Sequence, residues 1–419
     1  MFNTHASSTS SLPCYPVSIA LIASLALLVN TSFKLIAGFG MVFAASSLLC
    51  PLIAALYLWM LTTVPLARQR LILNQALLAL YLFSIGIFLL LNLPAPDNTR
   101  ANLAYQIIFD DLPGKFFAST LAFALSFYLP HAYFFIRKPA VLNGFRQRLL
   151  LALASGLAFF ALDFLLLFTS PDLEHFGQIY FDSLLLALLM LLGIGIAYLF
   201  CRRPGSAPKM VVADASGTYQ YLVGFAVMML LVCLACEYRL VSPAGVTLAA
   251  SSVLLPLLMI SSNLVGELFG YQANKRLIGI LLLAELIFDV LLMFLVMLPS
   301  PEFYNINAFY HLTLPRRIPA ATLAIVLAFG SNAWLLQVLK PYLRSQALRL
   351  FVANTVANTL LCLVTYSMLF TGVYPGAQIV DLAINAWIYK MIVMTLTVPM
   401  IVWVCQKCRL GLLNTPHPP

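Results

Sequence analysis

The chain has 419 residues, of which 62% are hydrophobic and 9% charged, and its mean hydropathy is +0.97. This composition excludes a soluble domain, because so much apolar surface is stable only in contact with lipid. The net charge of +9 would suit a nucleic-acid-binding protein, but the basic residues lie in short loops and form no single patch, so no nucleic acid partner is expected.

Apolar runs of membrane-spanning length recur along the whole chain. A transmembrane helix needs about 20 such residues, and the alternation typical of a membrane β-barrel is absent. The sequence therefore predicts an all-α polytopic protein in the lipid bilayer, with about 12 transmembrane helices. The predicted spans are 16–36, 38–62, 71–93, 116–136, 148–169, 180–200, 217–238, 244–266, 277–298, 318–339, 349–371 and 381–404.

The basic residues are distributed unequally between the two sides that these spans define. Most Lys and Arg residues lie in the even-numbered connections and the C-terminal tail, as in Arg202, Arg203, Lys275 and Arg276. By the positive-inside rule this side is cytoplasmic, and both termini lie on it. The first fifteen residues contain no Lys or Arg, so a cleaved signal peptide with a basic start is not expected.

The two halves of the sequence resemble each other at a constant spacing. Ala44-Ala-Ser-Ser47 recurs as Ala249-Ala-Ser-Ser252, and Pro51 recurs as Pro256, both 205 residues later. Lys138-Pro139 recurs 202 residues later as Lys340-Pro341. With an even number of spans in each half, the two repeats enter the membrane in the same direction. The predicted units are an N-terminal six-helix repeat at 1–200, a cytoplasmic linker at 201–216 and a C-terminal six-helix repeat at 217–419.

The stretch Pro256 to Arg276 carries the most informative polar groups. Asn263 and Glu267 are four residues apart and share one helix face, and Gly270 follows where a helix end favours a left-handed residue. Polar groups within a membrane span usually face a substrate or ion pathway. The alternative is an interfacial carboxylate neutralised by the basic pair Lys275 and Arg276.

Lys390 lies well inside the last span, where a charge costs at least about 2.5 kcal/mol. It either lines a cavity or forms a structural ion pair with Glu285 or Asp289, which share a face of the ninth span. Two other cationic or titratable residues are expected to be interfacial: Lys34 reaching toward water, and His131 at a span end.

The eleventh span has a stripe of amides and hydroxyls that includes Asn354 and Asn358. Such a stripe binds a ligand or holds helices together, since Asn and Thr commonly bridge helices within membranes.

The stretch from Pro256 resembles the signature of the queuosine precursor transporter family, also called the Vut family. That signature is a proline, an Asp seven residues later, a Glu four residues further, then Tyr-Gly and a basic pair. Pro256, Glu267, Gly270 and Tyr271 match it, whereas Asn263 replaces the aspartate and Phe269 the tyrosine. The resemblance covers about 217–404, and the first half is a more remote copy.

The resemblance implies import of 7-deazaguanine-type bases across the bacterial inner membrane. It also implies a substrate site of Asn263, Glu267, Asn332, Asn354, Asn358 and Lys390. Carboxylates and amides suit a neutral, guanine-like base, because one carboxylate can accept from two adjacent N–H groups. The first half offers Leu58, Thr62 and Pro65 at the positions of Asn263, Glu267 and Gly270, and is expected to be mainly a scaffold.

Other function classes lack their residue patterns. There is no phosphate-binding G-x-x-x-x-G-K-[ST] motif and no catalytic constellation, so an enzyme is not expected. Cys405 and Cys408 are a lone pair, so neither metal nor cofactor is expected. The alternatives to a transporter are a degenerate family member that acts as a binding or assembly protein, and a substrate-capture subunit for an external ATPase. Because two repeats are fused, self-association is not expected to be needed.

Overall fold

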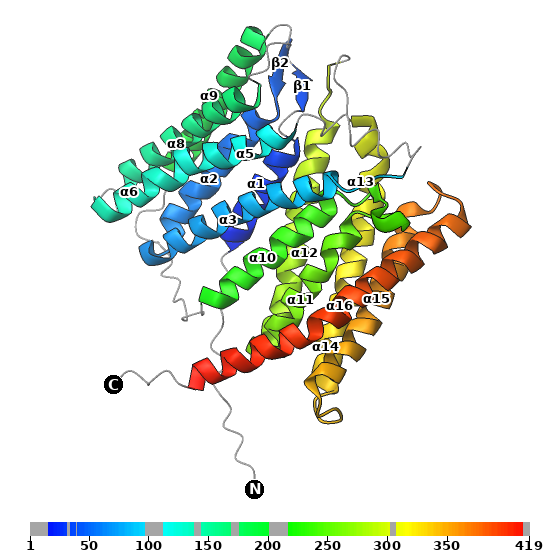
Figure 1. Cartoon of the computed structure of the whole chain (residues 1–419). Helices are drawn as coiled ribbons and strands as arrows, with labels where there is room; N and C mark the ends of the chain where they lie inside the picture. The colour runs from blue at the N-terminus through cyan, green and yellow to red at the C-terminus, as the bar shows by residue number, and fades with distance from the viewer. Residues whose placement is uncertain are drawn as a thin grey trace.

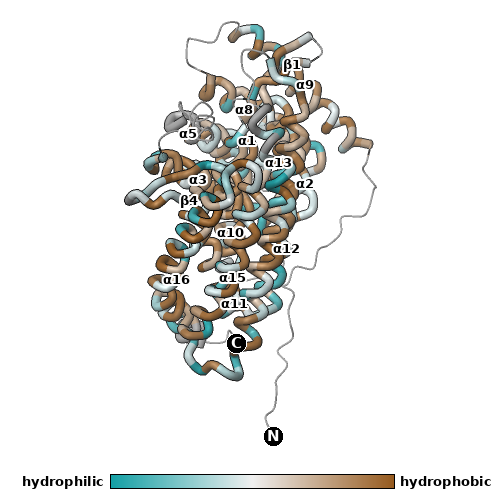
Figure 2. Tube along the Cα trace, turned by 90° about the vertical axis from the view of Figure 1, so that its right-hand side faces the viewer, coloured by the Kyte–Doolittle hydropathy of each residue, from teal (hydrophilic) through white to brown (hydrophobic). Residues whose placement is uncertain are grey.

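The computed structural model describes residues 16–31, 34–38, 40–96, 112–137, 144–168, 176–200, 217–301 and 307–413. The predicted linker at 201–216 lies outside these residues. Within them, eleven helices are long and apolar enough to cross a membrane, and the shorter apolar helix α1 (Pro16–Thr31) precedes them. The all-α polytopic prediction is confirmed. Figure 2 shows hydrophobic residues along most of the helical tube.

The N-terminal half begins with α1 and the hairpin of β1 (Leu35–Gly38) and β2 (Met41–Ala44). The remaining elements are α2 (Ser46–Thr63), α3 (Leu66–Leu91), α5 (Leu112–Phe123), the π-helical segment η1 (Ala124–Tyr128), α6 (Leu129–Arg137), α8 (Phe145–Leu167) and α9 (Phe176–Phe200).

The C-terminal half presents the same kinds of element in the same order. It begins with α10 (Gly217–Ala235) and the hairpin of β3 (Leu240–Val241) and β4 (Leu248–Ala249). The remaining elements are η2 (Pro243–Gly245, a 3-10 turn within the hairpin), α11 (Ser251–Phe269), α12 (Tyr271–Met297), α13 (Asn307–Ala324), the π-helical η3 (Ile325–Phe329), α14 (Gly330–Val338), α15 (Gln346–Phe370) and α16 (Gly376–Leu413).

The two hairpins correct the prediction that the apolar runs 38–62 and 244–266 are helical from their first residue. Each run begins as a turn and a strand, and the helix starts only at Ser46 or Ser251. Gly40 and Gly245 have φ of 74° and 80° within these hairpins. A left-handed residue at these positions reverses the chain, and glycine adopts it without a steric penalty.

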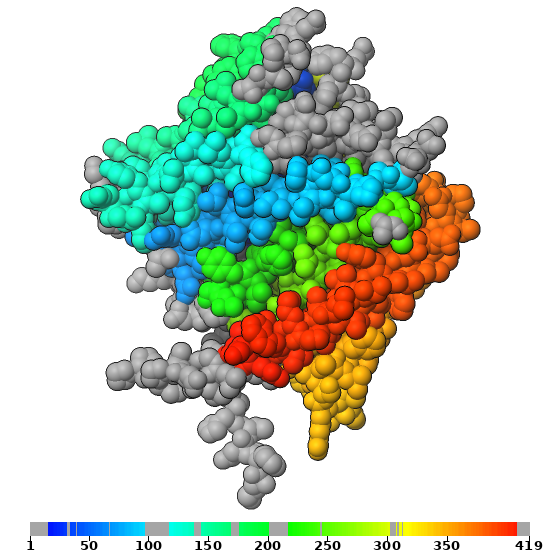
Figure 3. All heavy atoms as spheres, viewed as in Figure 1, coloured from blue at the N-terminus to red at the C-terminus, as the bar shows by residue number. Residues whose placement is uncertain are grey.

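The two halves meet along their first helices. Figure 1 shows the blue-to-cyan half and the green-to-red half side by side, with α1 and α10 between them. Helix α1 packs against α12, and α10 packs against α3, so the first helix of each half packs against the third helix of the other. Nearly every residue of α1 is buried, as expected for an apolar helix surrounded by other helices. In the space-filling view α3, α10 and α16 form successive diagonal bands on one face (Figure 3).

Candidate functional site

Three asparagine side chains meet in the interior of the C-terminal half. Asn263 lies on α11, Asn332 on α14 and Asn354 on α15, and each is at most 1% exposed. Asn332 Nδ2 donates to Asn263 Oδ1 at 2.8 Å, and Asn263 Nδ2 donates to Asn354 Oδ1 at 2.8 Å. The structure therefore joins three of the six predicted site residues in one amide chain. We call these three residues the amide chain.

The two ends of the amide chain are unsatisfied. Asn332 Oδ1 and Asn354 Nδ2 are buried, and neither has a hydrogen-bond partner within the described part of the chain. Buried polar atoms are nearly always paired, so an unpaired acceptor and an unpaired donor at one cluster call for an explanation. Reversing the orientation of all three amide groups exchanges the two ends but again leaves one donor and one acceptor unpaired.

Glu267 lies one helical turn beyond Asn263 on α11 and forms a buried ion pair. Arg349 Nη2, from the first turn of α15, donates to Oε1 at 2.8 Å and to Oε2 at 3.0 Å. Gln346 Nε2 adds a bond to Oε2 at 3.2 Å. Both Lys275 and Arg276 are exposed. The charge of Glu267 is thus balanced by Arg349, and the alternative in which Lys275 and Arg276 neutralise it is wrong.

Asn358 and Lys390 form a separate group one turn further along α15. Asn358 Nδ2 donates to the carbonyl of Trp387 at 3.2 Å, and its Oδ1 accepts from Cys362 Sγ at 3.6 Å. Lys390 Nζ lies 3.4 Å from Cys362 Sγ and 5.9 Å from the centre of the Tyr366 ring. Lys390 is 2% exposed, so it lies in the helix bundle as its depth in the span predicted.

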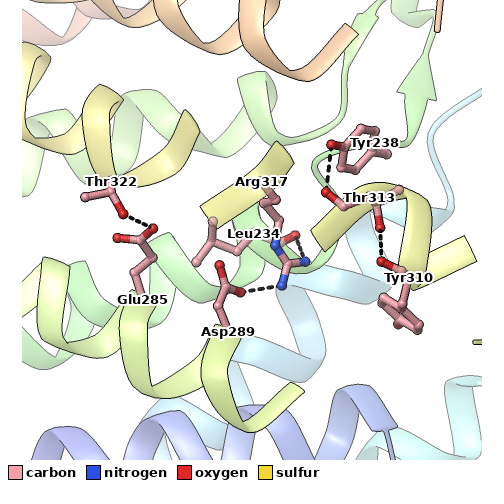
Figure 4. Close-up of polar contacts among 8 residues, drawn as sticks. All are labelled: Leu234, Tyr238, Glu285, Asp289, Tyr310, Thr313, Arg317 and Thr322. Atoms are coloured by element: carbon pink, nitrogen blue, oxygen red, sulfur yellow. Dashed lines mark hydrogen bonds and ion pairs between the residues drawn. The ribbon is translucent and has the colours of Figure 1, made fainter. Parts of the chain in front are cut away.

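The structural ion pair suggested for Lys390 is wrong, because both carboxylates have other partners. Asp289 pairs with Arg317, and Glu285 Oε1 accepts from the hydroxyl of Thr322 at 2.8 Å. Arg317 lies on α13, next to α12. The predicted span 318–339 begins one residue after Arg317, so the sequence placed Arg317 outside the spans. Figure 4 shows the two carboxylates on one face of α12.

Helix α15 organises the polar groups of this half. Arg349, Asn354 and Asn358 occur in order along it, and they contact Glu267, Asn263 and the backbone of α16 respectively. All three are buried. Two participants were not predicted: Gln346, which lies at the helix start, and Tyr366, whose hydroxyl lies 3.0 Å from Ser252 Oγ. Neither belongs to a motif, so spacing alone could not identify them.

The equivalent region of the N-terminal half is closed by packing. The residues 202 positions before Asn354 and Asn358 are Ala152 and Gly156. A Cβ atom at Gly156 would lie 2.6 Å from Cβ of Ala54, so α8 and α2 are in direct contact there. Such an approach leaves no room for a polar side chain or a ligand.

The N-terminal half nevertheless contains buried polar groups. His131 is 1% exposed, and its Nδ1 lies 3.0 Å from the hydroxyl of Tyr57. The expectation that His131 is interfacial is therefore wrong. Ser119 Oγ donates to Asp163 Oδ1 at 2.5 Å in the same half.

Comparison with known proteins identifies the region that contains these groups. Residues 249–404 match the Vut_1 family, described as putative vitamin uptake transporter. This stretch of the chain, which is less than half of its length, is similar to that family. The predicted resemblance is confirmed here, and the Vut_1 region contains all six predicted site residues. No curated protein and no solved structure matches the chain. The family and the membrane-length helices together support a transporter role.

Proposed function

We propose that this protein is a transporter of the bacterial inner membrane that imports queuosine precursors, the 7-deazaguanine-type bases, through its Vut_1 region. The observation that carries the proposal is the amide chain with its two unsatisfied ends. One buried acceptor and one buried donor complement the N–H and C=O groups on the edge of a guanine-type base. A neutral base fits a site whose polar atoms are mostly amides.

The ion pair of Glu267 and Arg349 closes the cytoplasmic end of this site. Lys275, Lys340 and Arg344 lie at the ends of the neighbouring helices, which the positive-inside rule places on the cytoplasmic side. The ion pair therefore lies between the amide chain and the cytoplasm. In the transport cycle Glu267 exchanges Arg349 for the adjacent N–H donors of the base. A carboxylate can accept two hydrogen bonds in the same geometry from a guanidinium group or from two adjacent N–H groups of a base.

The proposal includes one substrate site per chain and two fused six-helix repeats with both termini in the cytoplasm. The repeated element order, the left-handed glycines 205 residues apart and the exchanged first helices support the duplication. The close contact of Gly156 with Ala54 supports a single site. Fusion makes the interface between repeats intramolecular, so the monomer suffices for transport.

Uptake of a radiolabelled 7-deazaguanine-type base into cells that express the protein tests the proposal. We expect uptake above that of vector-only cells, and loss of uptake in Asn263→Leu. Asn92→Leu is the matched control, since Asn92 is exposed at the end of α3 and its side chain donates to the carbonyl of Phe88 in its own helix. No uptake by normally inserted protein would contradict the proposal and favour a non-transporting binding protein or a capture subunit.

A further inference from the structure

A second polar cluster lies away from the amide chain, around the C-terminal end of α10. Glu237 follows α10 by two residues and is 6% exposed. Its Oε2 atom is buried and has no hydrogen-bond partner among the described residues. An ionised carboxylate left in this state is costly, because burial removes water without supplying donors.

Three charged groups that act electrostatically on Glu237 are Glu285, Asp289 and Arg317, and Figure 4 shows their contacts. Arg317 donates to Asp289 and, through Nη1, to the carbonyl of Leu234 at 3.3 Å. Leu234 is in the last turn of α10, so Arg317 connects α12 and α13 to the turn that carries Glu237. Glu285 lies one helical turn from Asp289 and accepts from Thr322. We call Glu237, Glu285, Asp289 and Arg317 the acidic network.

The charges around Glu237 do not balance. Arg317 acts on it most strongly, followed by Asp289, Glu285 and Lys390. If all five groups were ionised, three carboxylates would face two cations and leave one excess negative charge in a buried region. One bound proton removes this excess. Three titratable groups that are neutral at pH 7 also interact electrostatically with Glu237: Cys233, Tyr238 and Tyr366.

The network is specific to the half that contains the amide chain. The residues 205 positions before Glu285 and Asp289 are Leu80 and Ser84, neither of which is ionisable. Buried carboxylates within membrane proteins commonly form the proton relays of transporters. The acidic network and the amide chain also share a scaffold, because α12 packs against both α11 and α14.

We propose that Glu237 is a proton-binding group, and that its protonation beside the Asp289–Arg317 pair couples import of the base to proton entry. This inference rests on the proposed function for its transport step, whereas proton binding by Glu237 stands by itself. In the cycle the carboxylate takes a proton from the external side to become the neutral acid. It releases that proton to the cytoplasmic side when Arg317 moves from Asp289 toward Glu237 and stabilises the anion.

The electrostatics of Glu237 agree with this role. The span predicted at 217–238 ends at Ala235 in the structure, so Glu237 lies beyond it. Burial raises the pKa of Glu237 to about 8, against the opposing effect of Arg317. The neutral acid therefore predominates at pH 7, and a closer approach of Arg317 would favour release of the proton.

Infrared difference spectroscopy of the purified full-length protein tests proton binding without any substrate. We expect a carbonyl band of a protonated carboxyl group that disappears as pH rises through about 8, and that is missing in Glu237→Gln. Asp381→Asn is the matched control, because Asp381 is exposed on α16 and its removal should leave the band unchanged. A band that persists in Glu237→Gln would overturn the assignment.

Proteoliposomes with a radiolabelled 7-deazaguanine-type base test the coupling. An inward proton gradient of about one pH unit should drive accumulation of up to about tenfold if one proton accompanies each base. Glu237→Gln should lose this accumulation but keep exchange of internal for external base. If the wild type neither exchanges nor accumulates base, the proposed function fails, while the infrared result still decides proton binding. Accumulation driven by a sodium gradient alone, or an unaltered proton dependence in Glu237→Gln, would overturn the coupling.

Discussion

Lys34 and Arg239, 205 residues apart, make the same contact in opposite directions across the interface between the halves. Lys34 Nζ lies 3.3 Å from the carbonyl oxygen of Leu298, and Arg239 Nη2 lies 3.4 Å from that of Leu93. Leu93 and Leu298 are also 205 residues apart. Each cation therefore binds backbone at the C-terminal end of the third helix of the other half, Lys34 at α12 and Arg239 at α3.

The backbone repeats this exchange. The N–H of Ala37 donates to the carbonyl of Pro299 at 2.9 Å, and the N–H of Ser242 donates to that of Pro94 at 2.7 Å. These four residues form two pairs with the same spacing of 205. A contact in which i meets j while the equivalent of j meets the equivalent of i is typical of a two-fold interface. The hairpins thus join the halves together with the first helices.

This interface predicts the effect of removing Lys34. The side chain is 1% exposed and also contacts Ser300 and Asn307, so the expectation that it reaches toward water is wrong. Lys34→Met removes the donor to Ser300 Oγ and Asn307 Oδ1 and leaves the carbonyl of Leu298 with its bond from Asn307 Nδ2, and it should lower the free energy of unfolding by about 1–3 kcal/mol. Thermal unfolding of the purified protein in detergent measures this loss of stability. Lys340→Met, at an exposed position, is the control and should have little effect.

The ion pair of Glu267 and Arg349 makes a test that separates binding from structure. Glu267→Gln should abolish base uptake, because an amide offers only one acceptor atom, and should lower stability because Arg349 is left unpaired. The exchanged double variant, Glu267→Arg with Arg349→Glu, restores the ion pair. We expect it to recover stability but not uptake, as measured by unfolding and by radiolabelled base. Recovery of both would show that the pair is structural only.

Lys390→Met should reduce transport more than it reduces the amount of folded protein. The contacts of Lys390 are a thiol and an aromatic face, which a methionine side chain can replace at little cost to packing. Its charge, however, is one of those that act on Glu237. Uptake divided by protein in the membrane is the measured quantity, and the exposed Lys407→Met is the control. A proportional loss of both would indicate a structural role.

The sequence predicted the spans well and the polar contacts only in part. Hydropathy locates helices because lipid contact requires apolar side chains, and the left-handed Gly270 was predicted from its place after the helix, where φ is 88°. The partners of buried charges depend on which helices pack together, which hydropathy does not encode. Glu267 therefore pairs with Arg349 and Asp289 with Arg317, although nearer basic residues were available in the sequence.

The hairpins could not be predicted for a related reason. The segments 35–44 and 240–249 are apolar and contain too few residues for a clear alternation. Their strands are stabilised by the reciprocal contacts with the other half, such as that of Ala37 with Pro299. Tertiary contact of this kind overrides local propensity.

The close approach of α8 and α2 predicts that the N-terminal half tolerates no added atom at Gly156. Gly156→Ala should destabilise the protein by about 1–3 kcal/mol, since the added Cβ would lie 2.6 Å from Cβ of Ala54. In a well-packed interior the neighbouring atoms cannot move apart without strain. Gly193→Ala on α9 is the control, because nothing lies within 4 Å of the added atom. That variant should be neutral or slightly more stable, as is usual for glycine in a helix. Thermal unfolding in detergent compares the two.

The final prediction is that one base binds per chain. The N-terminal half has Leu58, Ala152 and Gly156 where the C-terminal half has Asn263, Asn354 and Asn358, and the contact of Gly156 with Ala54 occupies the corresponding space. Calorimetry of the detergent-solubilised monomer with a 7-deazaguanine-type base should give a stoichiometry of one.

Two variants locate that site. Asn263→Leu should abolish the binding heat, because it removes the central donor and acceptor of the amide chain and leaves Asn332 and Asn354 unpaired. Leu58→Asn should leave affinity unchanged while lowering stability, since it buries an amide at a position that is 3% exposed in an apolar core. A stoichiometry of two, or a loss of affinity in Leu58→Asn, would show that the N-terminal half also binds the base, and that its tight helix contact opens during transport.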